Sequence, residues 1–358
     1  MAPMTVSFVT NRNPIRKRTT IVDFGTAFHD EGVGELRFGL ANLDLDKADP
    51  RCIDAWAVND LAGDDDVPLS LDVFPENLSL ATPKLGSRAL FEHLRGLMKS
   101  GDRRDTLVYV HGYSTTFREA LAAGFALQWR LRYGAPSWPV NVVVFTWPSD
   151  GSLMPWKAYR SDRQDAFATG PAFGRAFLKL RDFMAQLSAE DACERRVHLL
   201  CHSMGNYVLQ NALPSIIDQH GGQLPRIFDQ IVMAAPDVDA DALETAFKLG
   251  RLPEAARRLS VYINDRDKAL MTSDVTKGNP ARLGLDGPSN LTFVPDKVEV
   301  IDCSEATFRH DGAIQHHYYL EGRALADVAN TLAGRPGDRF QGSPRDWRGH
   351  RRWWVLRD

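Results

Sequence analysis

Short apolar runs alternate with longer segments of helical period between residues 107 and 303. Six of the runs are short and rich in apolar or β-branched residues, and turn residues follow each of them: 107–110, 140–145, 196–200, 231–235, 260–263 and 298–301. Such runs are typical of strands that are buried on both sides. The alternation therefore predicts an α/β fold, in which a mostly parallel sheet carries helices on both faces.

The spacing of apolar residues predicts helices between these strands. The segment after the second strand has a single stripe at i, i+4, i+7, i+11 and i+14, formed by Phe173, Phe177, Leu180, Met184 and Leu187. A capping box from Ser161 to Gln164 predicts the start of this helix, and Pro171 predicts a kink or a restart within it.

The two ends of the chain differ from this middle part. Residues 1–104 are less regular, and we expect them to add strands and a helix to the same sheet, with a separate N-terminal domain as the alternative. Residues 105–333 form the predicted core. Residues 334–358 are a tail with seven arginines, three aspartates and three tryptophans. We expect the tail to pack its aromatic side chains on the core with the arginine heads in water, and nucleic-acid binding is the alternative.

Composition and charge narrow the class of protein. Of 358 residues, 44% are hydrophobic and 25% charged, which excludes a disordered or fibrous chain. A net charge of −3 excludes a surface that as a whole attracts nucleic acid or anionic lipid. The four cysteines form no C-x-x-C pair, and no apolar run approaches the about 18 residues that span a bilayer. We therefore expect a cytoplasmic protein without a transmembrane segment.

A serine at a strand-to-helix junction is the most informative feature. The strand 196–200 continues through Cys201 into Ser203, and an apolar helix follows directly. In a nucleophile elbow, such a turn holds a serine in a strained conformation and lifts its Oγ above the sheet. Gly205 supplies a small residue where strand and helix nearly touch, and Cys201 stands at the position of the usual first glycine. The alternative role for Ser203 is an ordinary helix N-cap.

Backbone donors for an oxyanion are predicted on both sides of this serine. His111 and Gly112 follow the first strand of the core, so the N–H of Tyr113 could meet the N–H of Met204 at a developing negative charge. The dipole of the helix after Ser203 would add to the same field. We expect the His111 side chain itself to be structural.

Three aspartates are candidates for the acid of a serine, histidine and acid triad. Asp267 and Asp265 follow the strand 260–263, and Asp237 follows the strand 231–235. Catalytic groups gather at the carboxyl ends of parallel strands, so all three positions are suitable. We rank Asp267 first and Asp237 second, and expect the others to cap loops.

Histidines after the last core strand are candidates for the general base. His316 is the first choice, His317 the second and His310 the third, and all three keep the chain order serine, acid, histidine. Because no carboxylate or cysteine at ligand spacing joins the adjacent histidines, we expect no metal site and no cofactor.

At these residues the chain resembles the alpha/beta-hydrolase superfamily, and within it an esterase/lipase-like branch catalogued as a domain of unknown function. The similar features are Thr10-Asn11-Arg12, Val110-His111-Gly112-Tyr113 with Phe117, Phe145-Thr146-Trp147-Pro148-Ser149, Tyr159 with Asp162, Cys201-His202-Ser203-Met204-Gly205, Ala235-Pro236-Asp237, Asp267-Lys268-Ala269-Leu270 and His316-His317-Tyr318.

The resemblance implies a sheet of about eight strands and a triad. Ser203 is similar to the family's nucleophile, His316 to the base, and Asp267 to the group that fixes the imidazole tautomer. The family has a small residue between its histidine and the tyrosine, so His317 is a departure from the pattern.

The predicted reaction is hydrolysis of a small-molecule ester or acyl compound through an acyl-enzyme, with Trp147 and Tyr159 as walls of the substrate pocket. A non-catalytic binding or scaffold protein with this fold is one alternative, and hydrolysis of an amide, thioester or lactone is another. The segment 272–290 is expected to be a mobile loop at the mouth of the site or a plain surface connection. Oligomeric state does not follow from the sequence.

Overall fold

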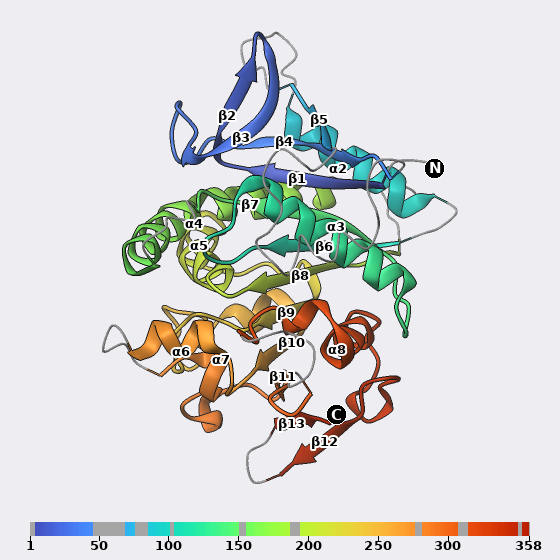
Figure 1. Cartoon of the computed structure of the whole chain (residues 1–358), viewed down its shortest axis with the longest axis vertical. Helices are drawn as coiled ribbons and strands as arrows, with labels where there is room; N and C mark the ends of the chain where they lie inside the picture. The colour runs from blue at the N-terminus through green and yellow to red at the C-terminus, as the bar shows by residue number, and fades with distance from the viewer. Residues whose placement is uncertain are drawn as a thin grey trace.

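The computed structural model describes residues 4–45, 69–75, 85–100, 104–149, 155–186, 194–275, 281–306, 314–349 and 353–357. Within them, an eleven-stranded sheet has the order β12-β13-β11-β10-β9-β8-β6-β7-β1-β4-β5 (Figure 1). The eight neighbouring strands from β13 to β1 are parallel. At the two edges, β12 pairs antiparallel with β13, β4 with β1, and β5 with β4. The predicted α/β fold class is confirmed, and the sheet has more strands than the resemblance implied.

The strands of this sheet are β1 (Met4–Thr10), β4 (Arg37–Leu43), β5 (Leu69–Val73), β6 (Asp105–Val110), β7 (Val140–Thr146), β8 (Val197–His202), β9 (Phe228–Ala234), β10 (Ala256–Ile263), β11 (Val298–Asp302), β12 (Arg345–Arg348) and β13 (Trp353–Leu356). All six predicted core strands are present as β6 to β11. Every residue of β7 and of β8 is buried, as expected for strands covered on both faces.

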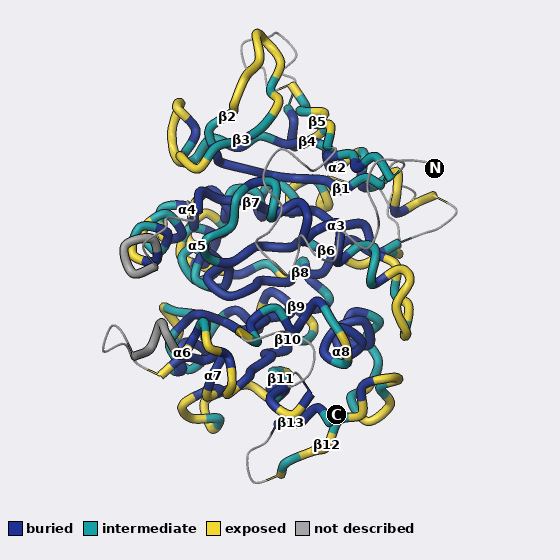
Figure 2. Tube along the Cα trace, in the orientation of Figure 1, coloured by how far each residue is buried: buried dark blue, intermediate teal, exposed yellow. Residues whose placement is uncertain are grey.

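The helices are α2 (Gly86–Lys99), α3 (Phe117–Tyr133), α4 (Pro155–Ala185), α5 (Gly205–Gln219), α6 (Lys268–Val275), α7 (Leu283–Asp286) and α8 (Gly322–Leu332). Two apolar cores separate them into layers, since side chains of α2, α4 and α5 pack on one face of the sheet and those of α3 and α8 on the other. Buried positions accordingly run through the middle of the molecule (Figure 2). Among the described helices, none is long and apolar enough to cross a membrane.

The long helix α4 corrects one prediction. It begins at Pro155, so the expected start at Ser161 was wrong, and Pro171 lies inside the helix, which continues past it. Proline suits a first turn because the N–H it lacks would have no partner there. A Ser-x-x-Gln pattern can also occur inside a helix, where the backbone N–H groups already bond to the preceding turn and need no cap. Leu187, the last residue of the predicted stripe, lies outside the described residues.

A hairpin of β2 (Arg12–Lys17) and β3 (Thr20–Phe28) forms a separate two-stranded sheet that the apolar pattern did not predict. Few of its positions are buried, so it has no apolar run to detect. Its buried residues matter nonetheless, because Phe24 packs against Phe117 of α3 with ring centroids 4.8 Å apart.

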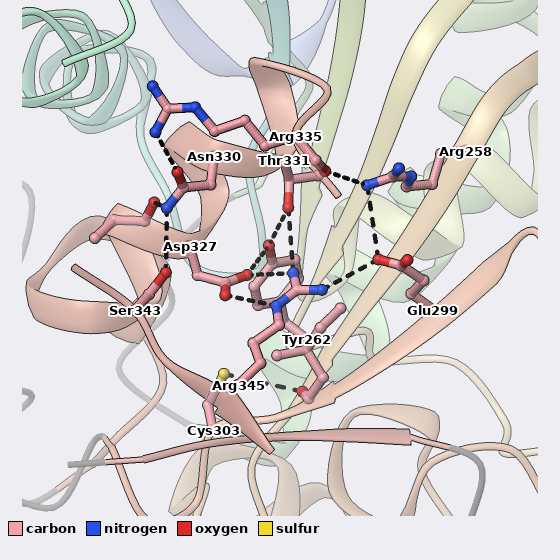
Figure 3. A network of polar contacts seen from close by, with 12 residues as sticks. Arg258, Tyr262, Glu299, Cys303, Asp327, Asn330, Thr331, Arg335, Ser343 and Arg345 are labelled. Atoms are coloured by element: carbon pink, nitrogen blue, oxygen red, sulfur yellow. Dashed lines mark hydrogen bonds and ion pairs between the residues drawn. The ribbon is translucent and has the colours of Figure 1, made fainter. Parts of the chain in front are cut away.

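The C-terminal residues extend the sheet through β12 and β13. Arg345 of β12 donates to both carboxylate oxygens of Asp327 on α8, at 2.7 Å and 2.5 Å, and its Nη1 lies 3.1 Å from Glu299 (Figure 3). Tyr262 of β10 also donates to Asp327, at 2.7 Å. The side chains of Arg345 and Asp327 are both 0% exposed. A buried ion pair thus joins the tail to α8, and the arginine that makes it points inward.

Candidate active site

Ser203 lies in the turn between β8 and α5 at the carboxyl edge of the sheet. Its φ is +50°, in the left-handed region that non-glycine residues rarely adopt. Its N–H donates to the Ala234 carbonyl at 2.9 Å, and its own carbonyl accepts from the Asp237 N–H at 3.2 Å. Hydrogen bonds to the neighbouring strand end therefore hold the strained backbone in place.

The turn is possible because two glycines let the chain pass closely. A Cβ on Gly205 would lie 2.7 Å from the carbonyl oxygens of Val110 and His111, so no larger residue fits there. A Cβ on Gly112 would lie 2.8 Å from the Ser203 Cβ. The loop after β6 consequently runs directly past the serine at Gly112, the residue before Tyr113.

Asp267 and His316 meet beside this turn. His316 Nδ1 lies 2.6 Å from Asp267 Oδ2, and Asp267 Oδ1 accepts from the Leu270 N–H at 3.0 Å. Asp267 is fully buried, and His316 is 8% exposed. The second contact fixes the carboxylate at the start of α6, and the first turns the Nδ1 side of the imidazole toward it, so Nε2 is the nitrogen on the far side of the ring.

His202 connects this pair to the serine. His202 precedes Ser203 in the chain, its Nε2 lies 3.2 Å from the His316 carbonyl oxygen, and the two imidazole centroids are 4.6 Å apart. Burial, with the nearby His316 and His317, lowers the pKa of His202 well below its usual value. The loops that carry Ser203, Asp267 and His316 therefore lie together, although they come from distant parts of the sequence.

The other candidates lie elsewhere in the cluster or outside it. Asp237 is 2% exposed and its carboxylate lies 3.4 Å from Arg282 Nε, while the Asp265 side chain is 71% exposed. His317 packs with its ring 4.9 Å from that of His202, and burial lowers its pKa to about 3, which makes it a weak base. His310 lies outside the described residues, as do residues 276–280 of the segment considered as a mobile loop.

Buried polar side chains anchor the loop that passes Ser203. Asp162 Oδ2 accepts from the Ser114 N–H at 2.9 Å and from Ser149 Oγ at 2.5 Å, and Ser149 Oγ accepts from the Thr115 N–H at 3.1 Å. Arg12 donates to the Thr115 carbonyl at 2.6 Å. Asp162, Ser149 and Arg12 are all 0% exposed. Ser114 has a φ of +53°, so these contacts hold a strained turn.

Sequence reasoning gave these three residues no anchoring role, although all of them fall within the segments that carry the family resemblance. Burial of Arg12 has no local signal, because its acceptors come from three other segments of the chain.

Contacts between His111 and Trp147 also stabilise the loop that passes Ser203. The two rings stack at 5.2 Å, the Trp147 N–H donates to His111 Nε2 at 3.1 Å, and the indole N–H donates to the His111 carbonyl at 3.1 Å. Burial, with Arg12 nearby, lowers the pKa of His111 well below its usual value. Trp147 is fully buried, so its side chain does not reach solvent.

An aromatic and cationic group lies on the α4 side of the serine. The Tyr159 ring lies 5.8 Å from the Tyr113 ring, and its hydroxyl accepts from Arg163 at 3.3 Å and from Arg282 at 3.5 Å. The Arg163 guanidinium carbon lies 3.8 Å from the centroid of Tyr207 on α5. Side chains from α4, α5 and two loops thus converge here.

Two further kinds of site, a reactive thiol and a metal site, were also considered. The thiol of Cys201 is fully buried, and burial raises its pKa far above the usual value, so it is not a reactive thiolate. In the described part of the chain, no group of three or more histidine, cysteine, aspartate or glutamate side chains is arranged to hold a metal ion.

A parallel sheet with covered faces, and a strained serine at the carboxyl end of a central strand, define an alpha/beta hydrolase fold. Residues 87–335 match the family described as "Alpha/beta hydrolase of unknown function (DUF900)". This is more than half of the chain, and the protein belongs to that family. Membership in this family supports the interpretation that the protein is a hydrolase.

Other comparisons add little. No curated protein matches the chain. Among solved structures, the crystal structure of Aspergillus fumigatus lipase B is similar, with 12% sequence identity and a TM-score of 0.37, over 75% of this chain and 61% of that chain. The matched part spans less than two thirds of the lipase.

Proposed function

We propose that the protein is a serine hydrolase that cleaves carboxylic esters through an acyl-enzyme. Ser203 is the nucleophile, His316 the general base and then the general acid, and Asp267 the group that orients the imidazole. The observation that carries the proposal is the 2.6 Å contact between His316 and the fully buried Asp267, close to a serine held at positive φ. A serine that only caps a helix would not need a buried aspartate and histidine pair beside it.

The reaction follows from these roles. His316 Nε2 takes the hydroxyl proton as Ser203 Oγ attacks the ester carbonyl carbon, and a tetrahedral oxyanion forms. The carbon–oxygen bond to the alcohol then breaks, and the alcohol leaves with the proton from His316. Water attacks the acyl-enzyme, His316 takes a proton from it and returns it to Ser203 Oγ, and the carboxylic acid is released. Asp267 keeps its charge and stabilises the imidazolium.

Backbone N–H groups stabilise the negative charge of the tetrahedral oxyanion. The N–H groups of Tyr113 and Met204 are the proposed donors, because Gly112 and the first turn of α5 lie against Ser203. The N-terminal end of the α5 dipole faces the same point. Removal of one such donor typically lowers kcat by about 100- to 1,000-fold.

Covalent labelling tests the nucleophile. A fluorophosphonate probe should label the wild-type protein once, on Ser203, and should not label Ser203→Ala. Ser215→Ala is the matched control, because Ser215 lies on the same helix and, within the described residues, its hydroxyl accepts a local hydrogen bond from Gln219 at 2.8 Å. Labelling of Ser203→Ala at the wild-type level would overturn the assignment.

Turnover tests the bond that is cleaved. Hydrolysis of p-nitrophenyl acetate and p-nitrophenyl butanoate should be lost in Ser203→Ala and kept in Ser215→Ala. Faster cleavage of a matched thioester, anilide or lactone would move the substrate class while leaving the serine mechanism in place. A folded protein with neither labelling nor turnover would instead support a binding or scaffold role.

A further inference from the structure

Arg163 lies between the two structural parts that border Ser203. On one side, its guanidinium carbon is 3.8 Å from the centroid of Tyr207, one helical turn after Ser203 on α5. Helical side chains lean toward the N-terminus of their helix, so the Tyr207 ring covers the turn nearer to the serine. On the other side, Arg163 donates at 3.3 Å to Tyr159, whose ring packs on Tyr113 in the loop that passes Ser203.

The neighbouring Arg282 differs from Arg163 because carboxylates neutralise its charge. Arg282 is 1% exposed and lies 3.4 Å from Asp237 and 3.1 Å from Asp239. Lys248 also lies 3.1 Å from Asp239. These ion pairs hold the loops after β9 and before α7 together, and they leave Arg282 with carboxylates on two sides.

Arg163, unlike Arg282, forms no ion pair with a described carboxylate. Its contacts within the described residues are the Tyr159 hydroxyl and the Tyr207 ring, and no described aspartate or glutamate lies within ion-pair distance of it. Burial acts to lower the pKa of Arg163, but Tyr159, Asp237 and Tyr207 raise it by more, so the group stays charged. A guanidinium has five N–H donors, and Tyr159 accepts one of them. The side chain is only partly buried, so solvent can reach it.

We propose that Arg163 binds an anionic substituent, a carboxylate or a phosphate, on the substrate whose ester carbonyl is attacked by Ser203. The proposal rests on the function proposed above and specifies its substrate class. Arginine presents paired N–H groups that match the oxygens of both anions. A hydrogen bond to a charged group corresponds to roughly a 10- to 100-fold preference for the anionic ester over a neutral ester of equal length.

Matched ester pairs test the preference and locate the anion. p-Nitrophenyl hydrogen glutarate and p-nitrophenyl 4-phosphonobutanoate carry the anion on the acyl side, with p-nitrophenyl pentanoate as the neutral partner. 4-Carboxyphenyl butanoate carries it on the alcohol side, with phenyl butanoate as the partner. The measured quantity is the ratio of kcat/KM for the anionic ester to that for the neutral ester, and wild type should show a ratio above one with at least one anionic ester.

Variants of two arginines on α4 separate local binding from general charge. Arg163→Gln should lower the ratio by about 10- to 100-fold, and Arg163→Lys should restore part of it. Arg160→Gln is the matched control, because Arg160 is exposed on the same helix and its removal changes the net charge equally. A wild-type ratio of one or less with every pair, or equal losses with charged and neutral esters in Arg163→Gln, would overturn the proposal.

Binding without turnover keeps this result independent of the catalytic assignment. In Ser203→Ala, the Kd for p-nitrophenyl hydrogen glutarate, or for whichever anionic ester wild type prefers, should rise by about 10- to 100-fold when Arg163→Gln is added. If the wild type hydrolyses no ester but this dependence is present, the proposed function fails and the anion site stands. If the Kd values are equal, the anion site fails whatever the fate of the serine mechanism.

Discussion

Two aspartate and histidine pairs lie at opposite ends of the central strands. At the amino ends, Asp105 of β6 and His198 of β8 are 3.3 Å apart, and both side chains are at most 5% exposed. At the carboxyl edge, Asp267 and His316 are 2.6 Å apart and similarly buried. The first pair follows from regular strand pairing, since Leu107 of β6 aligns with His198. Loops after two different strands bring the second pair together.

The difference shows that position in the fold, and not the pair itself, creates the candidate site. The carboxyl-edge pair lies by the strained Ser203, the start of α5 and the anchored loop 111–116. The amino-edge pair has a structural environment: burial acts to raise the pKa of Asp105, but hydrogen bonds from His198 and from the Arg196 N–H outweigh it and lower the pKa. His198 Nδ1 is buried and has no hydrogen-bond partner among the described residues.

The same substitution in both pairs should have the largest effect and should separate them. Asp267→Asn is expected to lower kcat for ester hydrolysis by about 10,000-fold, because the amide favours the wrong imidazole tautomer. Asp105→Asn should leave kcat nearly unchanged and lower the free energy of unfolding by about 1–3 kcal/mol. Steady-state kinetics and urea unfolding of both variants measure the two effects. Equal losses of kcat would contradict the comparison.

Asp327 is a third buried carboxylate, and its partner is Arg345 instead of a histidine. An arginine stays charged at all ordinary pH values. Arg345→Met should lower the free energy of unfolding by about 3–5 kcal/mol, because it leaves the charge of Asp327 buried and without its cation. Guanidinium chloride unfolding measures this. Arg357→Met is the control, because the exposed ion pairs of Arg357 with Asp346 and Glu305 should contribute little. A similar small change in both variants would show that the tail does not depend on the buried pair.

Asp162 tests whether the carboxyl edge depends on its loop anchor. Asp162→Ala removes the acceptor for the Ser114 N–H and for Ser149 Oγ, and the displaced loop should lower kcat by about 100-fold with a smaller change in KM. Asp162→Asn keeps one acceptor oxygen and should recover part of the loss. Kinetics on p-nitrophenyl butanoate, with thermal unfolding as the check on folding, give the result. A rise in KM alone would point to substrate binding instead of loop geometry.

Mild acid should weaken the carboxyl edge before the amino edge. The pKa values of His111, His202 and His317 are lowered by burial, so the unfolded chain binds protons below about pH 6.5 while the folded chain does not. Stability is therefore lost as pH falls through this range, by about 2–3 kcal/mol between about pH 7.5 and pH 6. Asp105 loses its contribution only below its usual pKa of 3.8. Urea unfolding at several pH values should show the first decline; a flat profile down to about pH 5 would contradict it.

Much of the fold was predictable because burial leaves a local pattern. Strands covered on both faces must be apolar along their whole length, and β7 is buried at all seven positions. The turn at Ser203 was also predictable, because a glycine is needed where α5 approaches the loop after β6. The hairpin β2–β3 and the strand β12 escaped prediction, since mostly polar strands have no apolar run. The four apolar residues of β13 were instead assigned to a tail packed on the core.

By itself, then, the sequence determined which segments form the central sheet and which serine stands at its carboxyl edge, because periodicity and turn residues act over a few positions. Tertiary structure alone decided that Asp267 faces His316 while Asp237 faces Arg282, and that Arg12 and Asp162 hold the loop beside Ser203. It also decided that Arg163 lies over Tyr207 without a carboxylate in reach, among the described residues. Such partnerships depend on how distant loops pack together, and no local pattern in the chain records them.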